Sequence, residues 1–464
     1  MSPNRIQYPM SKSTATRMLL NVNSTGAVVF HRTTTRFAFT LLLAIAATIS
    51  QPSRQAFAQD TTGTPSDASK PESERLPPGY EAPPEKLAIM ELDRPLLSKE
   101  ELAKLKKDAW NSFNRIRTEC DLSANGKRII EGSIRFRLAE MTVKEDQSKL
   151  LRLHQQFVGE LTTVGGVGKK ASEIQDMTKA LGQELVKQVP NVLKNNFYAR
   201  LHATEILGEI NYAPAYDVLI GIMQAKDITE DEENGQPEAV KIAAVSSLTR
   251  ILRFANPTPK ERLAIAFALV AELRKPDAFW WRQQRMIDAL RYCNIPGIDQ
   301  GNNDQPFVVE ALVAIVKDNQ RAWIVRTRAC YALGRVPFPK TVRVDDVITA
   351  ICECALEMCA AANANPRDLN WKRCFANLYF AFQPANGKDK DKDKDLNTEL
   401  QGPGGLLTRN SGASKKAYEV LIPIFNDVRI ASTDIHIAKP PAPENEKKLS
   451  DFVRARNGGQ AKND

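Results

Sequence analysis

The sequence predicts an all-α fold, an α-solenoid of about five helical hairpins that follows an N-terminal helical cap region. Two observations carry this prediction. Apolar residues recur at helical spacing along most of the chain, and one apolar helix pattern returns every 41 to 45 residues. At 464 residues the chain is long enough to bury a continuous core along such an array.

Residues 1–58 have the layout of a secretory signal peptide. Arg32 and Arg36 precede an apolar run over 37–49, and Ala56 and Ala58 provide the small residues of an A-x-A cleavage site. We therefore expect cleavage after Ala58 and an extracytoplasmic location, periplasmic or secreted. A membrane span needs ~20 apolar residues, so the short run makes an uncleaved membrane anchor the alternative.

The net charge of +9 depends mostly on this leader, which holds six Lys/Arg residues and no Asp or Glu. Without those six, 58 basic residues face 55 acidic ones. A chain so close to neutrality lacks the basic composition that is typical of nucleic-acid binding. We expect no nucleic-acid partner.

The region before the repeats divides into a spacer and a set of helices. Residues 59–97 are rich in Pro and Ser, which predicts a disordered spacer. Ser98 and Glu101 form an S-x-x-E capping box that predicts the start of a helical region over 98–190. Its segment 127–141, after an expected turn at 125–126, alternates like a strand but has helical flanks, and helix is the prediction. Further helices are expected over 145–163 and 169–188.

The repeat is clearest in the stretch 319–336, which contains V-R-x-x-A-x-x-A-L-G over 325–334. Its apolar residues form one stripe of a helix, and the alanines on that stripe allow close approach of another helix. Copies of the stripe end at five key leucines and have a small or flexible apolar residue four positions earlier. The leucines are Leu207, Leu248, Leu290, Leu333 and Leu378, and the earlier residues are Ala203, Ala244, Met286, Ala329 and Cys374.

This pattern resembles the second helix of a HEAT repeat, over residues 191–385. The resemblance implies helical hairpins whose first helices lie at 213–224, 261–273, 306–316 and 345–358. It also implies that the second helices line a concave face. Proteins of this family mostly bind other macromolecules.

The chain after the repeats is expected to be irregular except for one helix. Residues 386–412 include the alternating run KDKDKDKD at 388–395, which predicts a solvated loop. A calcium loop is disfavoured there because the lysines repel a cation. A capping helix is expected over 413–438, followed by a disordered tail over 439–464.

Motifs that would carry chemistry or hold a cofactor are weak. Cys352, Cys354 and Cys359 lie close in sequence, but residues two apart on a helix point in nearly opposite directions, so core thiols are favoured over metal ligands. GGVGKK at 165–170 lacks the glycine spacing of a phosphate-binding loop and predicts an interhelical turn. We expect no metal and no cofactor.

The second helices carry the best candidate binding residues. Positions five before the key leucines should face solvent, and they include His202, Arg285, Arg328 and Arg373. Trp280, Trp323 and Trp371 lie near the starts of the same helices. Arginine with interleaved aromatics is typical of binding hot spots. The alternative is structural: tryptophans wedged between repeats, and Arg200, Lys241 and Arg326 in the family's charge ladder.

These observations predict a non-enzymatic scaffold that binds a protein partner, of unknown identity, in the cell envelope. One alternative is an enzyme of the HEAT-like lyase or glycosylase kind, for which Asp288 is the nearest candidate acid. Another is a membrane-tethered structural protein that retains its leader. The sequence leaves the oligomeric state open.

Overall fold

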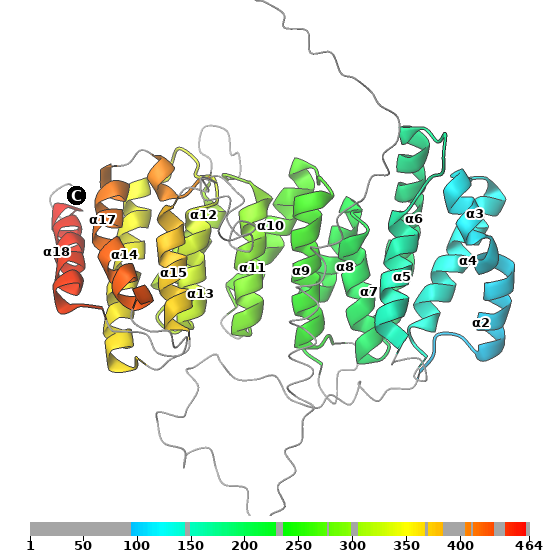
Figure 1. Cartoon of the computed structure of the whole chain (residues 1–464), viewed down its shortest axis with the longest axis horizontal. Helices are drawn as coiled ribbons and strands as arrows, with labels where there is room; N and C mark the ends of the chain where they lie inside the picture. The colour runs from blue at the N-terminus through cyan, green and yellow to red at the C-terminus, as the bar shows by residue number, and fades with distance from the viewer. Residues whose placement is uncertain are drawn as a thin grey trace, which may run out of the picture. The chain divides into compact units, whose positions relative to one another are not determined.

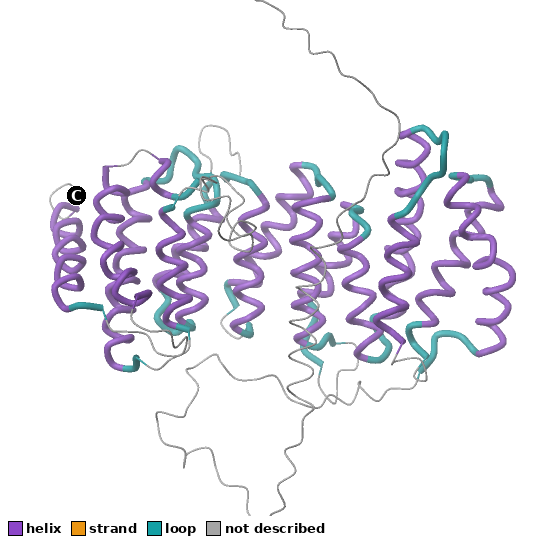
Figure 2. The backbone as a smooth tube through the Cα atoms, viewed as in Figure 1, coloured by secondary structure: helices purple, strands orange, loops and turns teal. Residues whose placement is uncertain are grey.

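The computed structural model describes residues 94–143, 149–228, 235–275, 278–297, 305–366, 370–383, 404–409, 412–430 and 441–460. These residues form helices and loops, and their β structure is limited to isolated bridge residues, such as the pair Asp227 and Gln236 (Figures 1 and 2). The all-α prediction is therefore confirmed for the described residues. The leader, its cleavage site, most of the 59–97 spacer and the 388–395 run lie outside them.

The N-terminal region begins at the predicted capping box. Ser98 Oγ accepts a hydrogen bond from the Glu101 backbone N–H at 3.2 Å, and the Glu101 carboxylate accepts one from the Ser98 N–H at 2.9 Å. These bonds satisfy two of the free N–H groups at the helix start. The helices of this region are α2 (Lys99–Leu105), the π-helical η4 (Lys106–Trp110), α3 (Asn111–Glu119), α4 (Ala124–Glu140), α5 (Leu150–Thr162) and α6 (Ala171–Val192).

Two expectations for this region need correction. The turn expected at 125–126 lies inside the first turn of α4, because Ser123 caps that helix by accepting from the Gly126 N–H at 3.1 Å. The helix predicted over 127–141 is confirmed, with Ile134, Phe136 and Leu138 all buried. The second correction concerns α6, which continues past its expected end to Val192 and contains Pro190.

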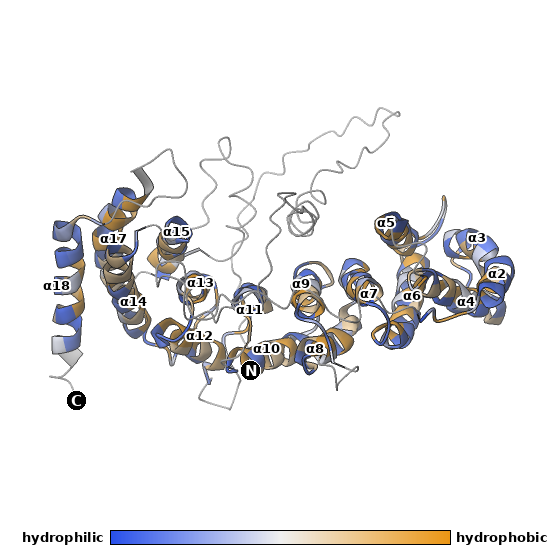
Figure 3. Ribbon diagram, turned by 90° about the horizontal axis from the view of Figure 1, so that it is seen from below, coloured by the Kyte–Doolittle hydropathy of each residue, from blue (hydrophilic) through white to orange (hydrophobic). Residues whose placement is uncertain are grey.

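Helices α7 to α15 pack in pairs and in two rows (Figure 3). The pairs are α8 with α9, α10 with α11, α12 with α13, and α14 with α15. Within one row α7, α9, α11, α13 and α15 each pack on the next, and within the other so do α8, α10, α12 and α14. The bounds are α7 Phe197–Glu209, α8 Tyr216–Gln224, α9 Glu238–Phe254, α10 Pro259–Leu273, α11 Trp280–Cys293, α12 Phe307–Lys317, α13 Trp323–Leu333, α14 Val344–Ala364 and α15 Trp371–Phe382.

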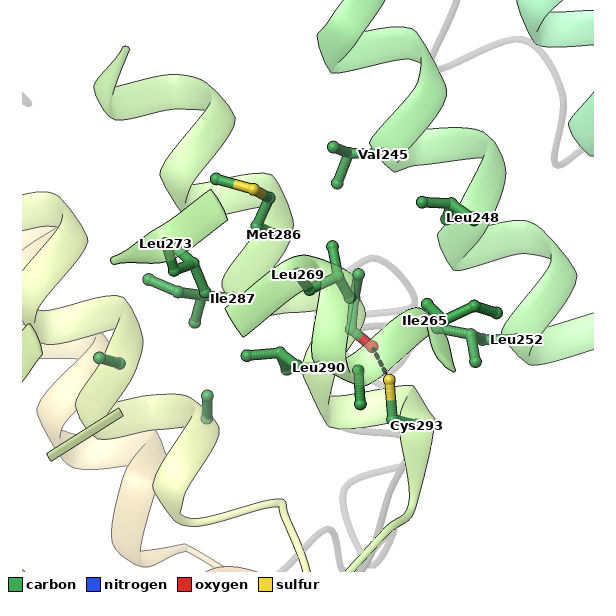
Figure 4. Close-up of a cluster of buried hydrophobic side chains, with 14 of the residues drawn as sticks. Val245, Leu248, Leu252, Ile265, Leu269, Leu273, Met286, Ile287, Leu290 and Cys293 are labelled. Atoms are coloured by element: carbon green, nitrogen blue, oxygen red, sulfur yellow. Dashed lines mark hydrogen bonds between the residues drawn. The ribbon is translucent and has the colours of Figure 1, made fainter. Parts of the chain in front are cut away.

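The core lies between and along these rows. All five key leucines, and the five residues four positions before them, are buried. Figure 4 shows how three helices meet: Val245 and Leu248 of α9 and Leu269 of α10 lie near Met286 and Leu290 of α11. Because each second helix buries its stripe against neighbours on the same row and on the other row, the apolar repeat of the sequence becomes one connected core.

Glycine follows the key leucine in two copies, and at both a side chain would strike the next second helix. A Cβ atom at Gly334 would lie 2.2 Å from the backbone oxygen of Ala381 on α15. At Gly208 it would lie 2.5 Å from the Ser247 side chain on α9. Real side chains do not make such contacts, so the Leu-Gly ending of the first and fourth copies is a packing requirement.

The C-terminal segment contains more helix than expected. The capping helix is present as α17 (Gly412–Ile430). The expected tail over 439–464 is wrong in part, because it contains α18 (Pro443–Gln460), which packs on α14 and α17. Few apolar side chains of α18 are buried, chiefly Leu449 and Val453. The mostly polar sequence therefore did not predict a helix, and contacts with other helices stabilise it. Arg456 provides one such contact, an ion pair with Asp345 at 2.9 Å.

Part of the expected 386–412 loop is also ordered. Residues Leu406–Arg409 form the 3₁₀ helix η7, with Leu406 fully buried. Arg409 lies over the Phe338 ring at 3.7 Å and donates to the Val336 carbonyl. Burial lowers the pKa of Arg409 to about 10. This short turn thus closes over the end of α13.

One described helix, α14, has the length and apolar composition of a membrane span. Most of it is covered, since it packs against α12, α13, α15, α17 and α18. Ile351, Cys352 and Ala355 are fully buried. These contacts account for its apolar composition as that of a core helix.

Candidate binding surface

The candidate binding residues predicted from the sequence divide between surface and interior. Arg373 is exposed and Arg285 is half-buried, whereas Arg328 and His202 are 5% and 8% exposed. The expectation of solvent-facing side chains is therefore wrong for Arg328 and His202. Because α13 packs against α11, α12, α14 and α15, and α7 against α5, α6 and α9, less of each helix is open than a single apolar stripe implies.

Arg328 belongs to a buried polar network between three second helices. Its Nε donates to Asp288 of α11 at 2.6 Å and its Nη1 donates to Asn377 of α15 at 3.3 Å. Arg291 pairs with the same carboxylate at 3.6 Å. Arg328 therefore joins α11, α13 and α15 in a structural role.

The same network decides what Asp288 can do. Burial alone would raise the pKa of Asp288, but the positive charges of Arg328 and Arg291 outweigh burial, and the pKa lies below its ordinary value. A carboxylate that stays ionised between two arginines has no proton to donate near neutral pH. Asp288 is therefore not placed to act as a proton donor, and its assignment as the acidic residue of a lyase or glycosylase stays a prediction.

The three tryptophans among the candidate binding residues also differ in burial. Trp371 is buried and its Nε1 donates to the Asn365 carbonyl at 2.6 Å. The Trp323 ring lies 6.0 Å from the Trp371 ring, and the Arg326 guanidinium lies 4.5 Å from the Trp323 ring centroid. These two tryptophans fill the contact between α13 and α15. Trp280, in contrast, is only half-buried and stacks on Trp281.

A buried hydrogen-bond donor lies seven residues before every key leucine. Arg200 donates to the Gly235 carbonyl at 2.9 Å, and Arg326 donates to the Val316 carbonyl at 2.9 Å. Lys241 pairs with Asp227. The complete set is Arg200, Lys241, Gln283, Arg326 and Trp371. The structural reading of Arg200, Lys241 and Arg326 is supported, because each ties a second helix to a neighbouring loop or helix end.

An accessible group of arginines and aromatics lies farther along the second helices. We call Arg250, Arg253, Phe254 and Tyr292 the arginine–aromatic strip. The Arg253 guanidinium lies 4.9 Å from the Phe254 ring centroid and 5.1 Å from that of Tyr292, so it bridges α9 and α11. Phe254 is 54% exposed. The strip thus combines a large exposed ring with two cations.

Arg291 links the strip to the buried network, since its side chain is only 7% exposed and pairs with Asp288. Its guanidinium lies 5.3 Å from the Tyr292 ring centroid and 4.6 Å from that of Tyr331. Sequence reasoning missed the strip because it followed positions before the key leucines. The available signal was the pair of Arg-aromatic dipeptides after them, Arg253-Phe254 and Arg291-Tyr292.

The cysteines have the character of core residues. Among the seven, all of them free thiols, only Cys120 is not fully buried. Burial raises the pKa of Cys293, Cys352 and Cys359 to about 12. A cysteine that binds a metal must be a thiolate, so these raised values agree with the interpretation of Cys352 and Cys359 as core thiols.

The comparisons with known proteins add no relative to these observations. No protein-family model, curated protein or solved structure matches this chain. The resemblance to HEAT repeats therefore rests on the recurring pattern of the chain's own sequence.

Proposed function

We propose that the chain is an exported HEAT-like α-solenoid that acts as a scaffold and binds another protein along its row of second helices. The helix pairs and the two rows of like helices support the solenoid arrangement. The spacing of the buried key leucines supports five repeat units. Such arrays offer a long surface on which side chains of successive repeats act together.

The observation that carries the binding proposal is the arginine–aromatic strip. Single exposed apolar residues are ordinary on protein surfaces, but Phe254 is flanked by Arg250 and Arg253. Arginine and aromatic residues dominate binding hot spots because they combine a large contact area with directional hydrogen bonds. The partner segment that fits this strip is acidic and carries an apolar side chain.

The proposal is tested by capturing partners from the cell-envelope fraction with purified protein. We expect Arg253→Glu combined with Phe254→Ala to weaken capture of the partner about 30-fold or more, since hot-spot truncations cost about 2 kcal/mol or more. Arg274→Glu is the matched control, because Arg274 is exposed at the end of α10, on the other row. Equal binding by both variants would contradict the assignment of the strip.

The accessible arginines among the candidate binding residues are tested in the same assay. Charge reversal at Arg285 and Arg373 should weaken capture while the melting temperature stays unchanged. Arg328 is left out because its side chain holds Asp288. A variant that melts early would instead place Arg285 or Arg373 in the structural framework.

Export is the second part of the proposal and rests on the leader sequence. N-terminal sequencing of the natural protein should find Gln59 as the first residue. An intact leader in the membrane fraction would favour the tethered alternative. A full-length chain in the cytosol would contradict export.

A further inference from the structure

A buried cluster of two histidines and a glutamate lies where α5 meets α7. His154 of α5 and His202 of α7 face each other with their Nδ1 atoms 3.0 Å apart. Glu205, one turn after His202, places its Oε2 3.3 Å from His202 Nδ1 and 3.9 Å from His154 Nδ1. Three donor atoms from two helices therefore surround one point.

The carboxylate oxygen at this point lies within ion-pair distance of both histidines but makes no hydrogen bond to a described residue. Glu205 Oε2 is inaccessible to solvent, and it makes no hydrogen bond to any of the residues that the structure describes. A buried oxygen left in this way is costly. The two histidine Nδ1 atoms lie 3.0 Å from each other, at hydrogen-bond distance, and near this oxygen, so the three atoms are close enough to share one ion.

The spacing of the three donors matches a small metal ion. Zinc lies about 2.0–2.2 Å from nitrogen and oxygen ligands, which places the donors of a tetrahedral site about 3.3–3.5 Å apart. The three distances here, 3.0, 3.3 and 3.9 Å, lie around that value. Two imidazoles with one carboxylate also suit zinc better than calcium or magnesium, which prefer oxygen ligands.

A second carboxylate completes the arrangement. Glu209 Oε2 lies 3.4 Å from Nε2 of His154, the ring nitrogen that does not face the cluster. Metal-binding histidines commonly donate their other N–H to a carboxylate, which fixes the tautomer and the ring orientation. Glu209 is placed to do this for His154.

We propose that His154, His202 and Glu205 bind a zinc ion through Nδ1, Nδ1 and Oε2, with water as the fourth ligand and Glu209 as a positioning residue. This revises the expectation of no metal. The ion would join α5 of the N-terminal region to α7, the first of the second helices, and so stabilise that junction. The site needs no cysteine and is independent of the binding proposal.

The test uses the full chain without a polyhistidine tag, stripped by a chelator and dialysed against zinc. We expect one zinc per chain by elemental analysis, a higher melting temperature with zinc, and visible absorption when cobalt(II) replaces zinc. His202→Gln and the isosteric Glu205→Gln should each weaken zinc binding 100-fold or more. Glu209→Gln should weaken it about 10- to 100-fold, as losses of outer hydrogen bonds do.

Glu131→Gln is the control, since Glu131 is an exposed carboxylate on α4. It should bind zinc like the unmodified chain, and circular dichroism should show that every variant is folded. If His202→Gln does not fold, Glu205→Gln decides alone. Absence of zinc binding, or binding that survives Glu205→Gln and His202→Gln, would overturn the proposal and leave the cluster as a hydrogen-bonded histidine pair.

Discussion

The junction between α13 and α15 and the junction between α9 and α11 join second helices in different ways. At the first, Gly334 lets the helix backbones approach so closely that a Cβ would strike Ala381. At the second, the Arg253 guanidinium bridges to Tyr292, and Phe254 remains exposed beside it. The comparison teaches that second helices pack in two ways: a glycine lets the backbones meet at the first junction, whereas long side chains fill part of the second and leave Phe254 exposed.

The largest loss is expected when Asp288 of α11 loses Arg328 of α13, the helix that also forms the tight junction with α15. Arg328→Ala should lower the free energy of unfolding by about 3 kcal/mol, because Asp288 loses its closest partner while remaining enclosed. Arg291 keeps the loss from being larger. Denaturant titration measures the loss in the free energy of unfolding.

The matched variant replaces both partners. Arg328→Met with Asp288→Leu should lose less stability than Arg328→Ala alone, since no enclosed carboxylate remains beside the lost arginine. A larger loss in the double variant would show that packing by the arginine stem, rather than its charge, holds α11 to α13.

Closing the space at the tight junction should have the next largest effect. Gly334→Ala forces α13 away from α15 and should cost roughly 1–3 kcal/mol. Gly221→Ala is the control, because a Cβ on α8 meets no atom within 4 Å. Alanine there should stabilise the helix by about 0.5–1 kcal/mol. Equal effects of the two changes would refute the packing role of Gly334.

The buried network should also make stability depend on pH. Asp288 has a lowered pKa in the folded chain, so its contribution is present above about pH 4, the ordinary pKa of aspartate, and is lost as pH falls through the folded pKa. Asp288→Asn removes this contribution. We expect its melting temperature to fall less steeply on acidification than that of the unmodified chain, and parallel curves would count against the network.

The smallest effect is expected at the open junction. Arg253→Ala and Phe254→Ala should each change the free energy of unfolding by no more than about 0.5 kcal/mol, as is usual for exposed side chains. Thermal melts measure this change. A loss above about 1 kcal/mol would mean that the strip is part of the framework and would weaken its assignment as a binding surface.

The helices and their buried stripes could be predicted from the sequence because they depend on local periodicity. The key leucines and the Ser98 cap are examples. Helix α18 was missed because Leu449 and Val453 give a weak stripe, and its stability comes from contacts with helices far away in the sequence. Gly334 was visible in the motif, but the atom that requires it, on Ala381, was not.

The surface residues were harder to predict than the core. His202 and Arg328 fit a solvent-facing position on an isolated helix, yet neighbouring helices cover both. His154 and His202 are 48 residues apart and share no motif, so nothing in the sequence brings them together. Contacts between helices that are distant in the sequence decide which polar residues become sites, and local periodicity does not reveal those contacts.

The buried thiols make the helix pairs individually observable. A thiol reagent cannot reach Cys293 of α11, Cys330 of α13 or Cys374 of α15 while those helices are in place. Labelling therefore occurs only during transient opening, and its rate reports the free energy of that local opening. Mapping the order in which these thiols react would show which of the three helices opens first. Proteolysis of the folded chain would begin near that helix.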